Sequence, residues 1–332
     1  MSLEFVGWEI RQAERFNRLL RFLPRYRTDR RWNARLIQTL LRAWDAVPRP
    51  FPPDDELTVE DRLIKGGDRP LKLRLIRPKG APRGVYLTFH GGAWVMGTPR
   101  FDDRLNRAIA GNCRVAVASV DHHLAIDDRL DLAIADAHRA AEWAVTAGAE
   151  FGSRNIIVGG QSSGAHLAAC ALLHLRDLQT DARLSGAALF YGAYDMAGSP
   201  GLRNSSNRTL LIDGQAAFRN LQRLTSGLTD EERRNPRLSP LYADFSGLPP
   251  ALFIAGELDP VFDDSIRMAD RWNKANSNAE LVAVPQGVHG FDRFPLAIAR
   301  KTHRHLHRTI NEWLRTDEHE ARRHERQPCS QV

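Results

Sequence analysis

The sequence contains little cysteine and no long uninterrupted run of apolar residues. Its three cysteines, an odd number in 332 residues, exclude a disulfide-stapled scaffold and favour a reducing compartment. No stretch approaches the ~18 consecutive apolar residues of a membrane-spanning helix. Residues 1–31 mix arginine and glutamate with the apolar residues, unlike the apolar core of a signal peptide. These absences predict a cytoplasmic protein.

Lysine is scarce as well, because arginine outnumbers it 42 to 5, and the formal net charge is +7. The excess lies at the ends of the chain. Residues 1–50 hold 11 basic and 5 acidic groups, whereas residues 51–300 hold 29 and 30. No nucleic-acid-binding motif accompanies the basic residues. We therefore expect no nucleic-acid partner.

The first 50 residues have the apolar spacing of helices. Trp32, Leu36, Leu40 and Trp44 recur every fourth residue and form one apolar stripe. The proline-rich stretch 48–56 cannot continue the helix and serves as a linker. We predict a helical segment over residues 1–50, a larger domain over 51–316, and a polar tail over 317–332 that is a solvated helix end or disordered.

The larger domain alternates short apolar runs with helical stretches. A half-exposed strand at residues 71–75 comes first. The buried runs that follow are Val85–Phe89, Val115–Val120, Ile156–Val158, Ala187–Phe190, Leu252–Ala255 and Leu281–Val284. This alternation predicts an α/β fold with a mostly parallel, doubly wound sheet, in which ligands bind beyond the carboxyl ends of the strands.

One of these strand ends carries a candidate nucleophile. Gly160-Gln161-Ser162-Ser163-Gly164 follows the strand at 156–158 and matches G-x-S-x-G between a strand and a helix. In that context the glycines permit a tight turn that holds Ser162 exposed. The other interpretation is a structural or phosphate-cradling loop, but the lysine of a phosphate-binding P-loop is absent.

A second strand end carries His90-Gly91-Gly92-Ala93-Trp94. Consecutive glycines let backbone N–H groups point into a cleft, as an oxyanion hole requires. Alone, the segment is equally compatible with a tight turn beside a buried histidine.

Two more strands are followed by a candidate acid and a candidate base. Asp259 follows the strand at 252–255, and His289 follows the strand at 281–284. A nucleophilic serine needs a base, and the base needs an anion that fixes its tautomer. The chain order Ser162, Asp259, His289 is that of the α/β-hydrolases. Glu257 is the one competitor for the acid.

With these motifs in register from about Leu71 to Leu314, the sequence resembles the bacterial hormone-sensitive-lipase-like esterases of the α/β-hydrolase fold. Further segments that carry the resemblance are Ser239-Pro240-Leu241 and Gly247-Leu248-Pro249-Pro250. The resemblance implies hydrolysis of carboxylic esters without a cofactor. It also implies a catalytic triad and an oxyanion hole, formed by Ser162, Asp259 and His289 and by the N–H groups of Gly91, Gly92 and Ser163.

The resemblance further implies a cap over the active site, made of the N-terminal helices and an insertion at about 198–232. Lying on an anionic membrane surface is the alternative role for the basic N-terminal helices. We expect them to cover the cleft, because this also explains the apolar stripe. The departures from the family pattern are Ala93 for a third glycine, Gln161-Ser162-Ser163 for Asp-Ser-Ala, and Asp121-His122-His123-Leu124-Ala125-Ile126-Asp127 for the family's D-Y-R-L-A-P-E. The first two preserve the backbone donors, and together the departures leave the subfamily and its substrate open.

Five histidines outside these motifs invite other interpretations. His303, His305 and His307 lie two residues apart on a helix and do not share a face, so we predict no metal site. His122 and His123 follow a strand, where they line the cleft or have a structural role.

The sequence therefore predicts a carboxylesterase for short-to-medium acyl esters, with a small-molecule ester as its partner. An amidase of the arylformamidase type and a non-catalytic small-molecule receptor on the same fold are the alternatives. Stable membrane insertion is not expected, and a homodimer is left open.

Overall fold

A computed structural model describes residues 3–47, 56–67, 69–206, 209–275 and 278–325, with side chains described up to residue 315. An eight-stranded sheet lies at its centre, in the order β1-β2-β4-β3-β5-β6-β7-β8. β2 is antiparallel to both neighbours, and β3 to β8 are parallel. The strands are β1 (Leu57–Ile64), β2 (Leu71–Pro78), β3 (Val85–Phe89), β4 (Ala116–Val120), β5 (Asn155–Gln161), β6 (Arg183–Phe190), β7 (Ala251–Gly256) and β8 (Ala279–Val284). The predicted mostly parallel α/β sheet is confirmed.

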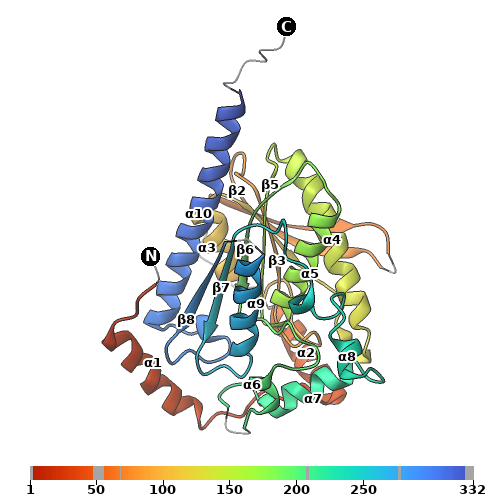
Figure 1. Cartoon of the computed structure of the whole chain (residues 1–332), viewed down its shortest axis with the longest axis vertical. Coiled ribbons are helices and arrows are strands. Elements are labelled where there is room, and N and C mark those ends of the chain that lie inside the picture. The colour runs from red at the N-terminus through yellow and green to blue at the C-terminus, as the bar shows by residue number, and fades with distance from the viewer. Residues whose placement is uncertain (1–2, 48–55, 68, 207–208, 276–277, 326–332) are drawn as a thin grey trace.

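Helices cover both faces of this sheet (Figure 1). One apolar cluster packs α4 (Leu130–Glu150), α5 (Ser163–Asp177) and α9 (Phe262–Lys274) against one face. A second cluster packs α3 (Asp103–Cys113) and α10 (Ala297–Glu325) against the other. Neighbouring residues of one strand enter different clusters, as Leu87 and Tyr86 of β3 do, because side chains alternate along a strand. Both faces are therefore dry, which explains the continuous apolar runs.

The differences from the sequence prediction lie at the edges and the ends. β1 was not predicted, because it is an edge strand whose side chains are mostly exposed and read as polar. α10 continues through the predicted boundary at 316, so the described first part of the tail is a helix end, one of the two predicted alternatives. The predicted linker falls almost wholly at 48–55, outside the described residues. No helix within the described ranges is both long and apolar enough to cross a bilayer.

The two predicted N-terminal helices are present as α1 (Gly7–Leu20) and α2 (Arg31–Ala46). The expectation that the stripe of α2 packs onto the body is wrong. Trp32, Leu36, Leu40 and Trp44 are 52–64% exposed, whereas Ala34 and Gln38 are buried. Polar attachments set this orientation. Gln38 bonds to the backbone of Gly97. Arg35 pairs with Asp127, the last residue of the short helix η1 (Ala125–Asp127), and Arg31 pairs with Asp128 directly after it.

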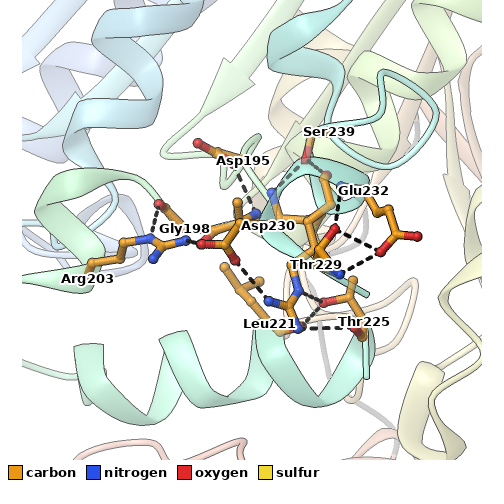
Figure 2. A network of polar contacts seen from close by, with 12 residues as sticks. Asp195, Gly198, Arg203, Leu221, Thr225, Thr229, Asp230, Glu232 and Ser239 are labelled. Carbon is orange, nitrogen blue, oxygen red and sulfur yellow. Dashed lines mark hydrogen bonds and ion pairs between the residues drawn. The ribbon is translucent and has the colours of Figure 1, made fainter. Parts of the chain in front are cut away.

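The insertion after β6 folds into α6 (Pro200–Arg203), α7 (Gly214–Leu224) and α8 (Asp230–Arg233). Figure 2 shows the polar network that joins these helices. Arg203 binds Asp230 (2.6 Å) and the carbonyl of Gly198 (3.0 Å), while Thr229 and Glu232 form the capping box of α8. Apolar residues of the insertion, Leu202, Leu221 and Leu224, enter the core, and the polar network joins its helices to one another.

The insertion is also joined to the N-terminal helices. The N–H of Tyr26 donates to the carbonyl of Leu211 (2.7 Å), and the N–H of Asp213 donates to that of Tyr26 (3.2 Å). Asp128 accepts from Arg31 of α2 and from Arg223 of α7. Figure 1 shows α1, α2, α6 and α7 at one end of the molecule, the end at which β6 leads into α6.

Candidate active site

Ser162 lies on the sharp turn between β5 and α5. Its backbone has φ 54° and ψ −122°, a left-handed region that is costly for a residue with a side chain. The flanking glycines allow the turn to form. A Cβ on Gly160 would lie 2.3 Å from the carbonyl oxygen of Gly164, and one on Gly164 would lie 2.0 Å from that of Phe89. The predicted nucleophile elbow is therefore present in geometry.

Three side chains from separate strand ends form one hydrogen-bonded chain. Ser162 Oγ lies 2.8 Å from His289 Nε2, and His289 Nδ1 lies 2.7 Å from Asp259 Oδ2. A carboxylate only accepts hydrogen bonds, so Nδ1 carries the proton and Nε2 accepts from the serine hydroxyl. The Asp259 side chain is fully buried, and its Oδ1 accepts from the N–H of Val261 (3.0 Å). Glu257, the competing acid, is exposed and does not contact the histidine.

Beneath His289 lies a residue that the sequence analysis did not single out. The ring of Tyr191 packs edge-on against the imidazole of His289, with the two ring centroids 4.9 Å apart. The tyrosine hydroxyl donates to Asp292 Oδ1 (2.6 Å). Tyr191 is 1% exposed, and burial raises the pKa of its phenol well above the usual value. Tyr191 is thus a neutral side chain, held by its own hydrogen bond, that packs against the His289 imidazole. Its position directly after β6, at the same edge as the other strand ends, is the signal that could have indicated it.

The predicted oxyanion loop runs from β3 over the serine. Gly92 has φ 132°, and a Cβ there would lie 1.9 Å from the carbonyl oxygen of Met96. Ala93 and Trp94 are also left-handed, with φ 53° and 63°. Within the described part of the chain, no acceptor takes a hydrogen bond from the N–H of Gly91, Gly92 or Ser163. Gly91 lies beside the serine, since a Cβ there would lie 3.2 Å from Ser162 Cβ, and Ser163 is its chain neighbour.

Side chains from α2 and α7 hold this loop. Gln38 of α2 exchanges two hydrogen bonds with Gly97, donating to its carbonyl (3.0 Å) and accepting from its N–H (2.8 Å). Asn220 of α7 donates to the carbonyl of Ala93 (3.1 Å). Both side chains are at least nine-tenths buried. Neither residue was predicted, because an isolated glutamine or asparagine in a helix carries no motif.

Buried histidines support the same loop. The indole N–H of Trp94 donates to His166 Nδ1 (3.2 Å), so the protonated Nε2 of His166 donates to the carbonyl of Leu238 (2.7 Å). His122 stacks on His90 at 4.2 Å and is 1% exposed, which answers the question about its role in favour of a structural one. Burial lowers the pKa of His90 and His166 to about 4 and that of His122 to about 3. All three are therefore neutral at physiological pH.

The departures from the family pattern have local explanations. Oriented to satisfy its neighbours, the Gln161 amide donates to Asp102 Oδ2 (3.1 Å) and to the carbonyl of Phe89 (3.2 Å). An aspartate at position 161 would instead bring a second carboxylate to Asp102. Ser163 is buried, and its hydroxyl has no partner among the described residues. Only its backbone N–H is placed for a role at the serine.

The C-terminal histidines do not contact Ser162, His289 or Asp259, although His303 reaches the aspartate that holds Tyr191. His303 lies 3.5 Å from Asp292, and His305 lies 3.0 Å from Glu280. Within the described ranges no three His, Cys, Asp or Glu side chains are grouped as a metal site would require. His123 is half-buried, and its backbone N–H donates to Asp136 (2.9 Å).

Comparison with known proteins agrees with this arrangement. A family profile described as the alpha/beta hydrolase fold matches residues 86–293. The arylesterase of Saccharolobus solfataricus is 29% identical over 254 residues, which cover 74% of this chain and 81% of the relative. A solved esterase of Pyrobaculum calidifontis is 26% identical with a TM-score of 0.75, over 90% of this chain and 97% of that one. A bacterial heroin esterase is 25% identical with a TM-score of 0.79, over 93% and 98%.

The sheet order, with one antiparallel strand before the parallel set, and the serine on its turn define an α/β-hydrolase. The chain belongs to this family, in its hormone-sensitive-lipase-like branch.

Proposed function

We propose that this protein is a serine carboxylesterase that hydrolyses short-to-medium acyl esters through an acyl-enzyme on Ser162. The observation that carries the proposal is the continuous chain from Ser162 Oγ through His289 to Asp259, with both contacts at hydrogen-bond length. A binding protein that performs no chemistry has no need of a serine in a strained backbone joined to a base and a buried acid.

In the first half-reaction His289 Nε2 takes the hydroxyl proton as Ser162 Oγ bonds to the ester carbonyl carbon. Asp259 stabilises the imidazolium that forms. The same Nε2 then gives its proton to the departing alkoxide, which leaves as the alcohol. In the second half-reaction His289 deprotonates a water that attacks the acyl-enzyme, and the serine recovers its proton as the acid leaves.

The negative charge on the carbonyl oxygen needs donors that are already in place. The N–H groups of Gly91, Gly92 and Ser163 serve as the oxyanion hole in this proposal, supported by their closeness to Ser162 and their lack of another described acceptor. Ser163 is also the first residue of the 15-residue helix α5, whose positive dipole end favours a developing anion.

We assign a cap to residues 1–50 and the insertion at about 198–232, a catalytic domain to 51–316 and a tail to 317–332. Contacts from Gln38 and Asn220 to the oxyanion loop support the cap assignment. A cap over the site closes a pocket of finite depth, which limits the length of the acyl chain that fits. Each buried methylene contributes up to ~0.8 kcal/mol until the pocket is full.

The test is hydrolysis of a p-nitrophenyl ester series by the full chain. We expect kcat/KM to rise over short acyl chains, peak at roughly four to eight carbons and fall for long ones. The resemblance to the family suggests this range, and methylene burial sets only the slope of the rise. An organophosphonate should abolish turnover and add one phosphonyl group, located on Ser162 by peptide mass spectrometry. Hydrolysis of N-formyl anilides alone would favour the amidase, and binding without turnover would favour a receptor.

A further inference from the structure

Exposed large apolar side chains are concentrated at the N-terminal end of the chain. Among the described residues, five such side chains lie beyond residue 47: Val59, Leu63, Leu178, Leu258 and Ile266. Eleven lie within residues 6–47, with exposures from 48% to 87%: Val6, Trp8, Leu19, Phe22, Leu23, Tyr26, Trp32, Leu36, Leu40, Trp44 and Val47. Single exposed apolar residues are ordinary, but such a concentration indicates an interaction surface.

The outer face of α2 is the most regular part of this surface. Trp32, Leu36, Leu40 and Trp44 follow one another every fourth residue along about 18 Å of helix. Each step of four residues turns ~40° round the axis, so the centre of this face lies roughly opposite Ala34 and Gln38. The attachments of Gln38, Arg31 and Arg35 to the body fix that orientation. The helix thus presents an apolar face to solvent in a defined direction.

The charge around this face selects its partner. Residues 6–47 contain ten arginines and four carboxylates. Six of the arginines form no ion pair with a described residue: Arg11, Arg15, Arg21, Arg25, Arg30 and Arg42. Two copies of such a surface repel each other, whereas an anionic lipid surface attracts it. A helix with tryptophan and leucine on one face and arginine beside them has the composition of helices that lie in a membrane interface.

We propose that the outer face of α2, together with Leu19, Phe22 and Leu23 at the end of α1, docks on an anionic lipid surface. Docking is peripheral, with α2 in the plane of the interface and its apolar side chains at the boundary of headgroups and acyl chains. Figure 1 places α1 and α2 at the end of the molecule where β6 leads into α6, so the docked protein presents its strand-end site to the lipid.

The experiment is co-sedimentation of the full chain with vesicles of phosphatidylcholine, alone or with about 30% phosphatidylglycerol. We expect binding to the anionic vesicles that weakens as salt is added. The double variant Leu36→Ser, Leu40→Ser should lower the partition coefficient roughly tenfold or more. The matched control is Leu63→Ser with Ile266→Ser, on exposed apolar residues elsewhere, and it should bind like the parent. Arg30→Glu with Arg42→Glu should remove the preference for phosphatidylglycerol.

Circular dichroism melting identifies folded variants, and the Leu36 and Leu40 side chains are exposed, so we expect both to be tolerated. The proposal is overturned if the full chain does not bind anionic vesicles, or if the Leu36/Leu40 variant binds as the parent does. It is also overturned if sedimentation velocity shows a dimer that dissociates on the same substitutions, because the face would then belong to a second copy.

Discussion

The surroundings of Ser162 and the helix α2 are built in opposite ways. Around the serine, the strand β5 and the first ten residues of α5 are almost wholly buried, and the polar groups of the site are attached to these packed elements. In α2 the polar residues Gln38, Arg31 and Arg35 make the attachments, and the apolar residues face outward. The core therefore holds the reacting atoms by packing, whereas α2 is held by a few directed bonds that single substitutions can remove.

Removing the nucleophile or the base tests the packed side of this comparison most strongly. Ser162→Ala or His289→Ala should lower kcat roughly 10⁴–10⁶-fold, because the two act as a unit. The double variant should be little worse than either single one. Stopped-flow or overnight assays with p-nitrophenyl acetate measure the loss. Turnover near the parent rate in Ser162→Ala would refute the mechanism.

The choice of acid comes next in size. Asp259→Asn should lower kcat roughly 10⁴-fold, because an amide cannot hold His289 in the tautomer whose Nε2 accepts the serine proton. Glu257→Gln is the matched control, since this exposed carboxylate does not contact the histidine. The same steady-state assay compares them. The assignment of the acid fails if Glu257→Gln is the slower variant.

Acid should weaken the packed region through its neutral histidines. An unfolded chain protonates them near ~6.5, but burial lowers the pKa of His90 and His166 to about 4 and that of His122 to about 3. Between about pH 6.5 and 4 the unfolded state therefore binds more protons, and stability falls as pH falls. The loss approaches ~1.4 kcal/mol per histidine per pH unit. The buried Asp264, whose carboxyl pKa is raised, offsets part of it.

Urea unfolding midpoints between pH 7.5 and 5, on the parent and on His122→Gln, measure this slope. The variant should show a shallower slope even if it is less stable overall. A parent midpoint that stays constant over this range would contradict the expectation.

The directed bonds of α2 give a smaller but more selective effect. Gln38→Met removes both hydrogen bonds to Gly97 with little change of volume and should lower kcat roughly tenfold, because the oxyanion loop loses a fixed support. KM should change less. Arg35→Gln, which breaks only the exposed pair with Asp127, is the control. An unchanged kcat in a folded Gln38→Met would show that the loop does not depend on α2.

The smallest effect concerns the strained loop itself. Ala93 has φ 53°, so Ala93→Gly should raise the free energy of unfolding by about 0.5–1 kcal/mol. Ala108→Gly, in the middle of α3, should lower it by about 1 kcal/mol. Urea denaturation of both variants gives the comparison. A loss of stability in Ala93→Gly would mean that strain at this residue is compensated by packing of its methyl group.

The residues of the candidate site that follow directly after a strand could be predicted from the sequence, because the end of the strand determines where they lie. Ser162, Asp259 and His289 each follow an apolar run, and parallel strands end at one edge, so their meeting could be anticipated. Hydrogen bonds between side chains and backbone groups far apart in the chain could not be predicted. Gln38 is 59 residues from Gly97, and Asn220 is 127 residues from Ala93. Neither bond leaves a local pattern.

The orientation of α2 was the clearest failure, and its cause is physical. Apolar periodicity identifies a helix and its apolar face. That face turns to the core only if its burial contributes more free energy than the contacts of the polar face. Here the aspartates at 127 and 128 and the backbone of Gly97 offer specific partners to the polar face. Those partners belong to the body of the protein, and periodicity within residues 31–46 contains no information about them.

The two hydrogen bonds between Gln38 and Gly97 couple the conformation of the oxyanion loop to the attachment of α2. If ordering the loop favours the attached helix, then attaching the helix favours the ordered loop by the same free energy. A ligand that fills the oxyanion hole should therefore slow hydrogen exchange at the backbone amides of α2, although this helix contributes no group to the proposed reaction. Conversely, whatever holds α2 in place raises the fraction of molecules that are ready to react.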